Sequence, residues 1–197
     1  MANRSFLVLN HSGNPSEEWS SEHVIVAASW IMPVLWFSLF RPDDRMTRTE
    51  QWIDDDADED AEDVHYHDVG YPALLTRTKI AQQRAITGRH TFVTFFPERL
   101  ARYYDQWVVL LSNLDTAYVM LDIGELWAMG APDYFDRLLD SCSKTFAHQQ
   151  RPDWVTLCEQ SGMKMDAQSG AVVFEEEAIG HCLYGYWWER PVPWRQM

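Results

Sequence analysis

The sequence predicts an α+β fold, in which a mixed, mainly antiparallel sheet packs with four to five helices in a single domain over residues 1–197. Two observations predict it. Segments of strand type and of helix type follow one another without the regular alternation of a doubly wound α/β sheet. The composition, 46% hydrophobic and 14% aromatic over 197 residues, is sufficient to bury a core without disulfides.

The first part of the chain predicts two strands and a helix. Ser5–Leu9 is a short apolar run of strand type, and the polar residues after it predict a loop. Val24–Phe40 carries no charge over 17 residues, close to the length of a membrane span. Its β-branched start and its internal proline instead favour a buried strand followed by a short helix over Pro33–Phe40. Arg41–Gln51 is charged and is expected to be exposed.

The middle of the chain predicts helices and strands in irregular order. Ala73–Thr87 is expected to be a helix that ends at Gly88, and His90–Phe96 a strand. Glu98–Ser112 predicts an amphipathic helix, because its apolar residues recur at spacings of three and four. Ala117–Ile123 predicts either a strand or the start of a longer helix.

The last part predicts two helices, a hairpin and a strand. Pro132–Ala147 has the apolar spacing of a helix, and Pro152–Gln160 begins with a proline that suits a first helical turn. Met163–Phe174 resembles a hairpin, since a polar, glycine-containing turn separates two apolar runs. Cys182–Trp188 is expected to be the last strand.

The charge of the chain is concentrated in one segment. The sequence has 30 acidic and 16 basic side chains, a formal net charge of −14. Eight of the ten residues from 54 to 63 are acidic, namely Asp54, Asp55, Asp56, Asp58, Glu59, Asp60, Glu62 and Asp63. Like charges at this density predict a solvated loop or a protein-docking surface. The negative charge argues against direct binding to nucleic acid or to an anionic membrane, whereas a basic protein would be attracted.

Metal sites and acid–base pairs are weaker hypotheses. The acidic segment lacks the glycine and the final glutamate that a calcium loop requires, because Glu59 and His65 occupy those positions. His65 and His67 place two imidazoles on one side of an extended segment, which is a weak zinc motif without a third ligand. Asp122 and Glu125, together with Asp133 and Asp136, offer possible carboxylate pairs, but such pairs are expected by chance in so acidic a chain. We therefore expect no cofactor and no catalytic residue.

Aromatic residues near the C-terminus are the second candidate for partner binding. Successive residues of a strand face opposite ways, so Trp187 and Trp188 cannot both enter one core, and exposed large aromatics commonly anchor protein interfaces. The alternative is a strand that is buried on both faces. The three cysteines are too few and odd in number for a disulfide framework, which predicts reduced thiols and a cytoplasmic protein.

The first forty residues resemble a bacterial family of small acidic proteins. Members open with Met-Ala-Asn-Arg-Ser-Tyr-Leu, as Met1–Leu7 nearly does, and continue with a Trp-Pro-apolar segment similar to Ser29–Phe37. Many of these proteins resemble the immunity proteins of polymorphic or secreted toxin systems, and Leu121–Trp127 is less specifically similar to such proteins. The resemblance carries over no catalytic residue, and the acidic segment is not a feature of the family.

Together these observations favour a non-catalytic function. The leading expectation is an immunity protein that binds a cognate toxin with a basic surface and covers its active surface, without binding nucleic acid or membrane itself. One alternative is a metal-assisted hydrolase that uses the His65/His67 region. Another is an acidic mimic of nucleic acid that occupies DNA-binding proteins.

Overall fold

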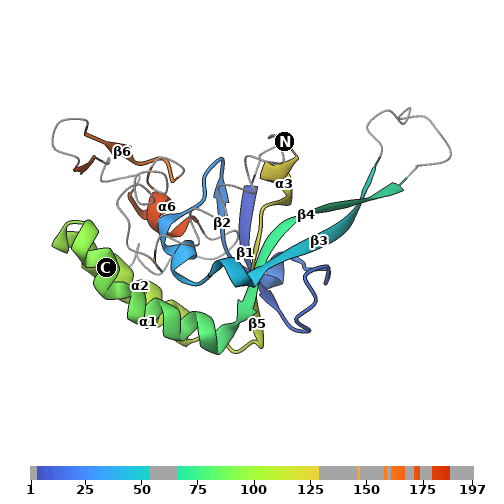
Figure 1. Cartoon of the computed structure of the whole chain (residues 1–197), viewed down its shortest axis with the longest axis horizontal. Helices are drawn as coiled ribbons and strands as arrows, with labels where there is room; N and C mark the ends of the chain where they lie inside the picture. Colours follow the sequence, from blue (N-terminus) through green and yellow to red (C-terminus); the bar gives the residue numbers. More distant parts are fainter. Residues whose placement is uncertain are drawn as a thin grey trace.

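A five-stranded antiparallel sheet organises the chain (Figure 1). The computed structural model describes residues 4–53, 66–128, 146, 158, 161–166, 171–173 and 179–186. The strand order is β2-β1-β5-β4-β3, and every pair of neighbours is antiparallel. The strands are β1 (Arg4–Asn10), β2 (Val24–Ser29), β3 (Arg45–Ile53), β4 (Tyr66–Arg77) and β5 (Tyr118–Asp122). The fold is therefore α+β, as the sequence predicts.

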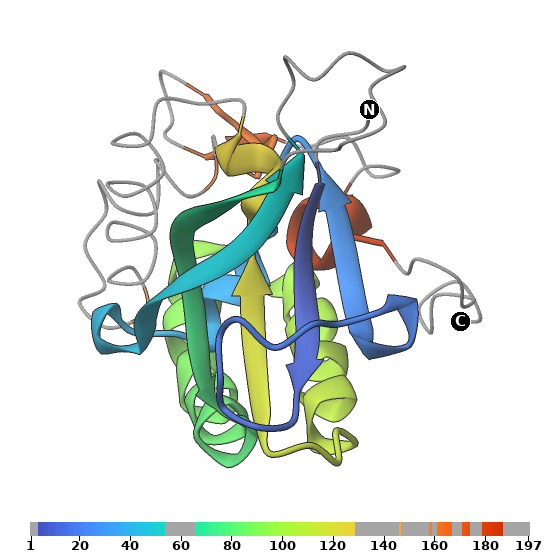
Figure 2. The ribbon, with the colours of Figure 1, turned by 90° about the vertical axis from the view of Figure 1, so that its right-hand side faces the viewer.

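Helices cover one face of the sheet, and the loop of residues 11–23 crosses the other (Figure 2). The helices are α1 (Thr78–Phe95), α2 (Ala101–Ser112), α3 (Gly124–Trp127) and α6 (Ile179–Tyr184). Short 3-10 helices are η1 (Ser21–His23), η2 (Val34–Ser38), η3 (Pro42–Asp44) and η4 (Glu98–Leu100). A separate hairpin, β6 (Lys164–Met165) with β7 (Val172–Val173), confirms the prediction for that segment.

The strands β1, β2 and β5 bury both of their faces. Leu7, Val26 and Leu121 point to the helices, whereas Phe6 and Met120 belong to a smaller cluster on the loop face. This alternation along each strand follows the two-residue period of side chains in a sheet. It also explains why β1 and β2 are predicted well, since their apolar runs are nearly continuous, while for β5 the structure selects the strand from the two predicted alternatives.

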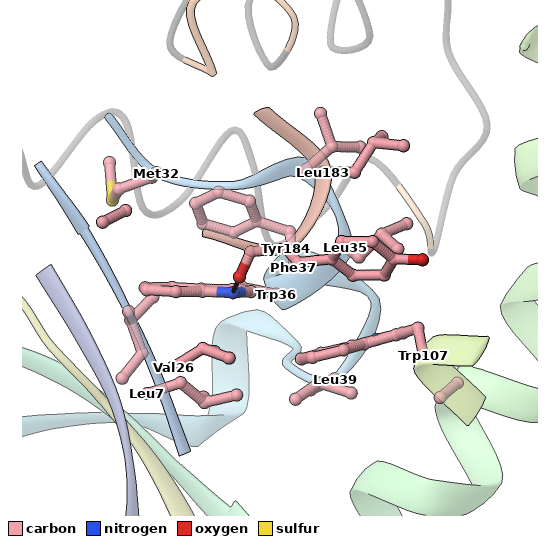
Figure 3. Close-up of a cluster of buried hydrophobic side chains, with 14 of the residues drawn as sticks. Leu7, Val26, Met32, Leu35, Trp36, Phe37, Leu39, Trp107, Leu183 and Tyr184 are labelled. Carbon is pink, nitrogen blue, oxygen red and sulfur yellow. Dashed lines mark hydrogen bonds between the residues drawn. The ribbon is translucent and has the colours of Figure 1, made fainter. Parts of the chain in front are cut away.

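The helix-face core is built around two tryptophans (Figure 3). Trp36 of η2 is fully buried, and its Nε1 donates a hydrogen bond of 2.7 Å to the carbonyl oxygen of Tyr184 in α6. Trp107 of α2 is also fully buried, and its Nε1 donates to Ser38 Oγ at 3.2 Å. The uncharged segment after Pro33 thus forms a buried 3-10 helix. The indole N–H groups of Trp36 and Trp107 are both hydrogen-bonded, as burial requires.

Helix α1 corrects two predictions. It begins at Thr78, because Ala73–Arg77 continue β4, and it runs through Gly88 to Phe95, so the strand expected over His90–Phe96 is wrong. Gly88 serves packing instead of ending the helix. A Cβ there would lie 2.6 Å from the hydroxyl oxygen of Tyr104 in α2, which donates to the carbonyl oxygen of Ala85. The glycine therefore allows α1 and α2 to pack closely.

The strand expected over Cys182–Trp188 is also wrong. Residues up to Tyr184 form helix α6, and Gly185, at φ +84°, turns the chain back toward the sheet. Tyr186 then exchanges two backbone hydrogen bonds with Ala27 of β2, at 2.7 and 2.6 Å. A Cβ on Gly185 would lie 2.2 Å from the Ala27 carbonyl oxygen, so only glycine permits this approach.

Other predictions have mixed outcomes. The helix over Glu98–Ser112 is confirmed as η4 and α2, and Arg41–Gln51 is largely exposed but forms much of β3. The helices expected over Pro132–Ala147 and Pro152–Gln160 lie outside the described residues, apart from the buried Phe146 and Cys158. None of the helices in the described part of the chain combines the length and apolar character that a membrane span requires.

Candidate protein-binding site on the β3–β4 hairpin

The hairpin of β3 and β4 extends beyond the rest of the sheet (Figure 1). Strand β4 pairs with β5 only over Leu74–Arg77, whereas its residues Tyr66–Ala73 pair with β3 alone. We call these residues and their partners, Met46–Ile53, the hairpin arm. The residues 54–65 join its two strands, since Ile53 pairs with Tyr66.

Pro72 explains where the arm leaves the sheet. The Thr78 N–H, immediately after β4, donates to the carbonyl oxygen of Ala117 at 3.0 Å, so even-numbered residues of β4 direct their backbone groups toward β5. Toward the start of β4, Leu74 is the final even-numbered residue that pairs with β5, and Pro72 is the next even-numbered residue. Because proline has no N–H, it cannot extend this ladder, and it is tolerated at an edge.

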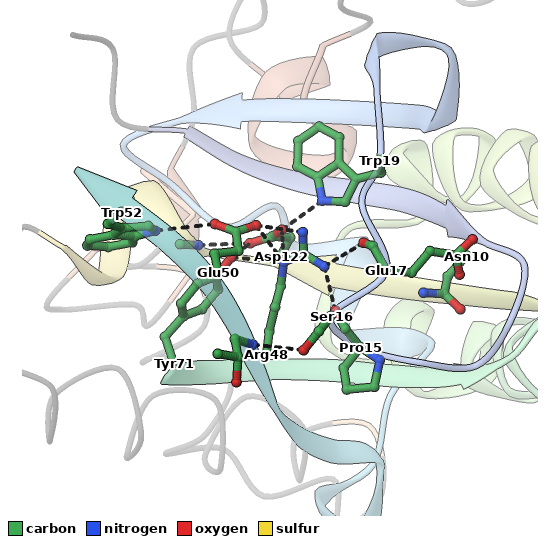
Figure 4. Close-up of polar contacts among 12 residues, drawn as sticks. Asn10, Pro15, Ser16, Glu17, Trp19, Arg48, Glu50, Trp52, Tyr71 and Asp122 are labelled. Atoms are coloured by element: carbon green, nitrogen blue, oxygen red, sulfur yellow. Dashed lines mark hydrogen bonds and ion pairs between the residues drawn. The ribbon is translucent and has the colours of Figure 1, made fainter. Parts of the chain in front are cut away.

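A two-stranded ribbon is marginally stable in water, so the arm needs support. Its base is held by a buried arginine (Figure 4). Arg48 is 3% exposed, and its Nε lies 3.0 Å from Asp122 Oδ2 and 2.9 Å from the hydroxyl oxygen of Tyr71. The same atom lies 2.7 Å from Glu50 Oε1. These four residues, together with Trp19, are called the arginine anchor.

The Asp122 carboxylate accepts hydrogen bonds on both oxygens. The Gly124 N–H donates to Oδ1 at 2.9 Å and the Tyr71 hydroxyl at 3.2 Å, while Trp19 Nε1 donates to Oδ2 at 2.9 Å. Burial raises the pKa of Asp122, and Arg48 and these donors oppose the shift. Burial also raises the pKa of Tyr71, which keeps its hydroxyl protonated and able to donate. The carboxylate is thus fully used in structural contacts.

Arg48 also ties the loop of residues 11–23 to the arm. Its Nη1 donates to the carbonyl oxygens of Pro15 and Glu17, the latter at 2.9 Å. The N–H of Thr49, the next residue in β3, donates to Ser16 Oγ at 2.9 Å. Burial lowers the pKa of Arg48, but Asp122, Tyr71 and Glu50 outweigh it and raise the pKa overall, so the guanidinium stays charged.

Aromatic rings complete the base of the arm. Trp52 of β3, Tyr71 of β4 and Trp127 of α3 lie with ring centres 5.9 to 6.1 Å apart. A shallow depression of about 460 Å³ lies beside them. It is lined by Arg45, Met46, Thr47, Gly70, Tyr71, Pro72 and Trp127. Because these rings and the arginine anchor both hold the base, the arm projects from a rigid support.

Beyond this base the arm is solvent-exposed. Ile53 is 56% and Tyr66 is 60% exposed, which places two large apolar side chains on either side of the acidic segment in the sequence. His67 and Asp68 of β4 are exposed as well. Exposed apolar groups next to charged ones are typical of protein interfaces.

The residues predicted from sequence as partner-binding lie outside the described residues. They are Asp54, Asp55, Asp56, Asp58, Glu59, Asp60, Glu62, Asp63, Trp187 and Trp188. His65 lies outside as well, while His67 is exposed opposite Trp52. Within the described ranges, no three or more His, Cys, Asp or Glu side chains are grouped so that they can hold a metal ion.

The carboxylates of Asp122 and Glu125 do not pair with each other, and Asp133 and Asp136 lie outside the described residues. Asp122 contacts Arg48, and Glu125 binds Arg4 at 3.0 Å, so each is neutralised by an arginine. Sequence reasoning missed the arginine anchor, although a lone aspartate at the end of the apolar run of β5 is a signal that a buried charge needs a partner. No protein-family model, curated protein or solved structure matches the chain significantly.

Proposed function

We propose that this protein is an immunity protein, which binds a cognate toxin and covers its active surface. The observation that carries the proposal is the hairpin arm. Its base is held by a buried arginine, its far end exposes Ile53 and Tyr66, and the sequence between these two residues carries eight acidic side chains. An anchored protrusion of this kind suits binding to a protein, because its base has little conformational freedom left to lose on binding.

The charge of the arm indicates the kind of partner. A toxin that acts on phosphate-containing substrates needs a basic surface, and a dense negative segment speeds encounter with such a surface. The similarity of Met1–Leu7 and Ser29–Phe37 to small acidic immunity-like proteins supports the same proposal. Cys182 is a buried free thiol, which fits a protein kept in the reducing cytoplasm, where a toxin would be met.

The test is capture of the partner followed by inhibition. Tagged protein is incubated with lysate of the native host, and the captured protein is identified, purified and assayed for its own activity. We expect one stoichiometric, basic partner that loses its activity when the complex forms. A captured partner whose activity is unchanged, or no partner at any salt concentration, would overturn the proposal.

The role of the acidic segment is tested with matched charge changes. One variant replaces Asp56, Asp58 and Asp60 by Asn, and the control replaces the distant, exposed Glu22, Glu98 and Asp115 by Gln or Asn, so that both change the net charge by +3. We expect the first variant to bind the partner more slowly and with a weaker dependence on salt than the control. Equal association rates for the two variants would rule out electrostatic steering by this segment.

A further inference from the structure

The outer edge of β3 has a defined set of free backbone groups. Thr49 N–H donates to Ser16 Oγ and not to β4, so this residue directs its backbone away from the hairpin partner. The register Arg45–Ile53 is continuous, without a bulge, and in an antiparallel pair such residues alternate with those bonded to the neighbour. Gln51 and Ile53 therefore direct their N–H and carbonyl groups outward, as Thr49 does.

The pairing of β4 with β5 supports the same orientation. Even-numbered residues of β4 face β5, as the Thr78 N–H bond to Ala117 indicates, so odd-numbered ones face β3. These include Val69 and His67, the partners of Glu50 and Trp52. The backbone groups of Glu50 and Trp52 therefore bond to β4 within the hairpin, while those of Gln51 and Ile53 do not.

From Thr47 to Ile53, the described structure gives this edge little protection against pairing with another chain. Natural edge strands carry outward charges, prolines or bulges. Here Thr47, Thr49, Gln51 and Ile53 are uncharged and exposed. The charged side chains between them, Arg48 and Glu50, are bound in the arginine anchor.

Between Thr47 and Ile53, the described residues block the edge at one point. Ser16 occupies the Thr49 N–H, and the loop that carries it is fixed by the Arg48 contacts to Pro15 and Glu17. From Gln51 to Ile53 no described residue bonds to the outward groups. The free stretch begins beside this loop and runs toward the end of the arm that carries the acidic segment.

We propose that the β3 edge from Gln51 to Ile53 accepts an extended segment of the basic partner protein, which adds a strand to the hairpin arm. This inference rests on the proposed function. Backbone pairing supplies the affinity, and the charges of the arm select a cationic strand. Exposed Asp68 lies directly opposite Gln51 in the hairpin, and eight acidic residues follow Ile53 within ten positions. A second copy of this chain is disfavoured, because each copy carries a net charge of −14.

Hydrogen exchange on the unmodified protein tests the pairing. The probes are an eight-residue peptide of alternating lysine and valine, and the same peptide with its edge-facing amides N-methylated, which cannot pair. In the free protein we expect the amides of Gln51 and Ile53 to exchange faster than that of Trp52. The first peptide should slow both amides about tenfold, and the methylated peptide should not. Equal protection by the two peptides, or protection by neither, would overturn the proposal.

Proline substitutions test the same edge in the complex. Gln51→Pro removes one outward N–H without touching the ladder to β4. Thr47→Pro makes the same change on the other side of Thr49, and Gln51→Ala removes only the side chain. We expect Gln51→Pro to weaken binding of the lysine-valine peptide and of the captured partner about tenfold, and both controls to bind like the unmodified protein. Thermal unfolding followed by circular dichroism verifies that each variant is folded.

The outcomes separate this inference from the proposed function. If the captured toxin is inhibited but binds Gln51→Pro as tightly as the unmodified protein, strand addition is wrong and the immunity function stands. If no toxin is captured but the lysine-valine peptide alone protects Gln51 and Ile53, the edge accepts strands and the immunity function is wrong.

Discussion

The two faces of the sheet are closed by different interactions. On the helix face, large apolar side chains such as Trp36 and Trp107 are fully buried, and their few polar atoms are hydrogen-bonded. On the loop face, a smaller apolar cluster lies beside the charged pair of Arg48 and Asp122. Apolar burial stabilises in proportion to area, whereas a buried ion pair mainly penalises any arrangement in which one partner is missing. The helix face therefore supplies stability, and the loop face fixes the position of the arm.

The largest expected effect is on the helix face. Trp36→Ala should lower the free energy of unfolding by about 4 kcal/mol, because it removes a fully buried indole and leaves the cavity around it. The control, Trp30→Ala, changes a tryptophan that is 63% exposed and should cost less than about 0.5 kcal/mol. Urea denaturation measures both. Similar losses for the two variants would contradict the assignment of the main core to this face.

The loop face is tested by breaking and then replacing its ion pair. Asp122→Ala leaves Arg48 buried without its main partner and should cost about 3 kcal/mol. The double variant Arg48→Met with Asp122→Leu should cost less than Asp122→Ala alone, because no uncompensated charge remains. Urea denaturation of the single and double variants gives the comparison. A double variant that costs as much as Asp122→Ala, or more, would contradict this account, because removing the unpaired charge would then bring no relief.

The stability of the helix layer should depend on pH through His181 in α6. Burial lowers the pKa of His181 in α6 below its ordinary 6.5, and its Nε2 is buried without a hydrogen-bond partner in the described structure. The unfolded chain therefore takes up this proton more readily, so stability should fall as the pH drops below about 6.5. His181→Gln should flatten the change in urea midpoint between neutral and mildly acidic pH, whereas His67→Gln, at an exposed position, should not. An unchanged slope for both variants would assign the effect to other groups.

The smallest expected effect is on the contact between loop and arm. Ser16→Ala removes the acceptor of the Thr49 N–H at an exposed position, so stability should change by less than about 1 kcal/mol. Exchange of the Thr49 amide should nevertheless become faster, while that of Glu50, paired with Val69, stays slow. A Thr49 amide that remains protected in this variant would show that something other than Ser16 covers the edge.

The segments of the chain differ in how far the sequence predicts their structure. The strand β1 and the helix α2 follow from their apolar patterns and are predicted within a few residues, whereas for β5 the sequence leaves a strand and a helix start open. Gly88 and the segment from Cys182 to Tyr186 mislead, because Gly88 is a packing contact and Cys182–Tyr184 belong to helix α6, which the chain leaves at Gly185. In both cases tertiary contacts outweigh local preference.

The candidate site is predicted only in part. The acidic segment is visible in the sequence because its charge is local. The arginine anchor is not, since its members meet only after folding, and Tyr71 and Asp122, for example, are 51 residues apart. That the arm leaves the sheet at Pro72 also depends on which strand lies beside β4, which no local pattern encodes.

The hydrogen bond between Trp36 and Tyr184 has a consequence for biosynthesis. Its partners are 148 residues apart, so the indole donor of Trp36 finds its acceptor only after 148 further residues have been translated. A nascent chain emerges N-terminus first, and long-range contacts of this kind form late and slowly. The apolar segment around Trp36 therefore remains without its packing partner α6 while synthesis continues. During that time its exposed apolar side chains make the nascent chain prone to aggregation.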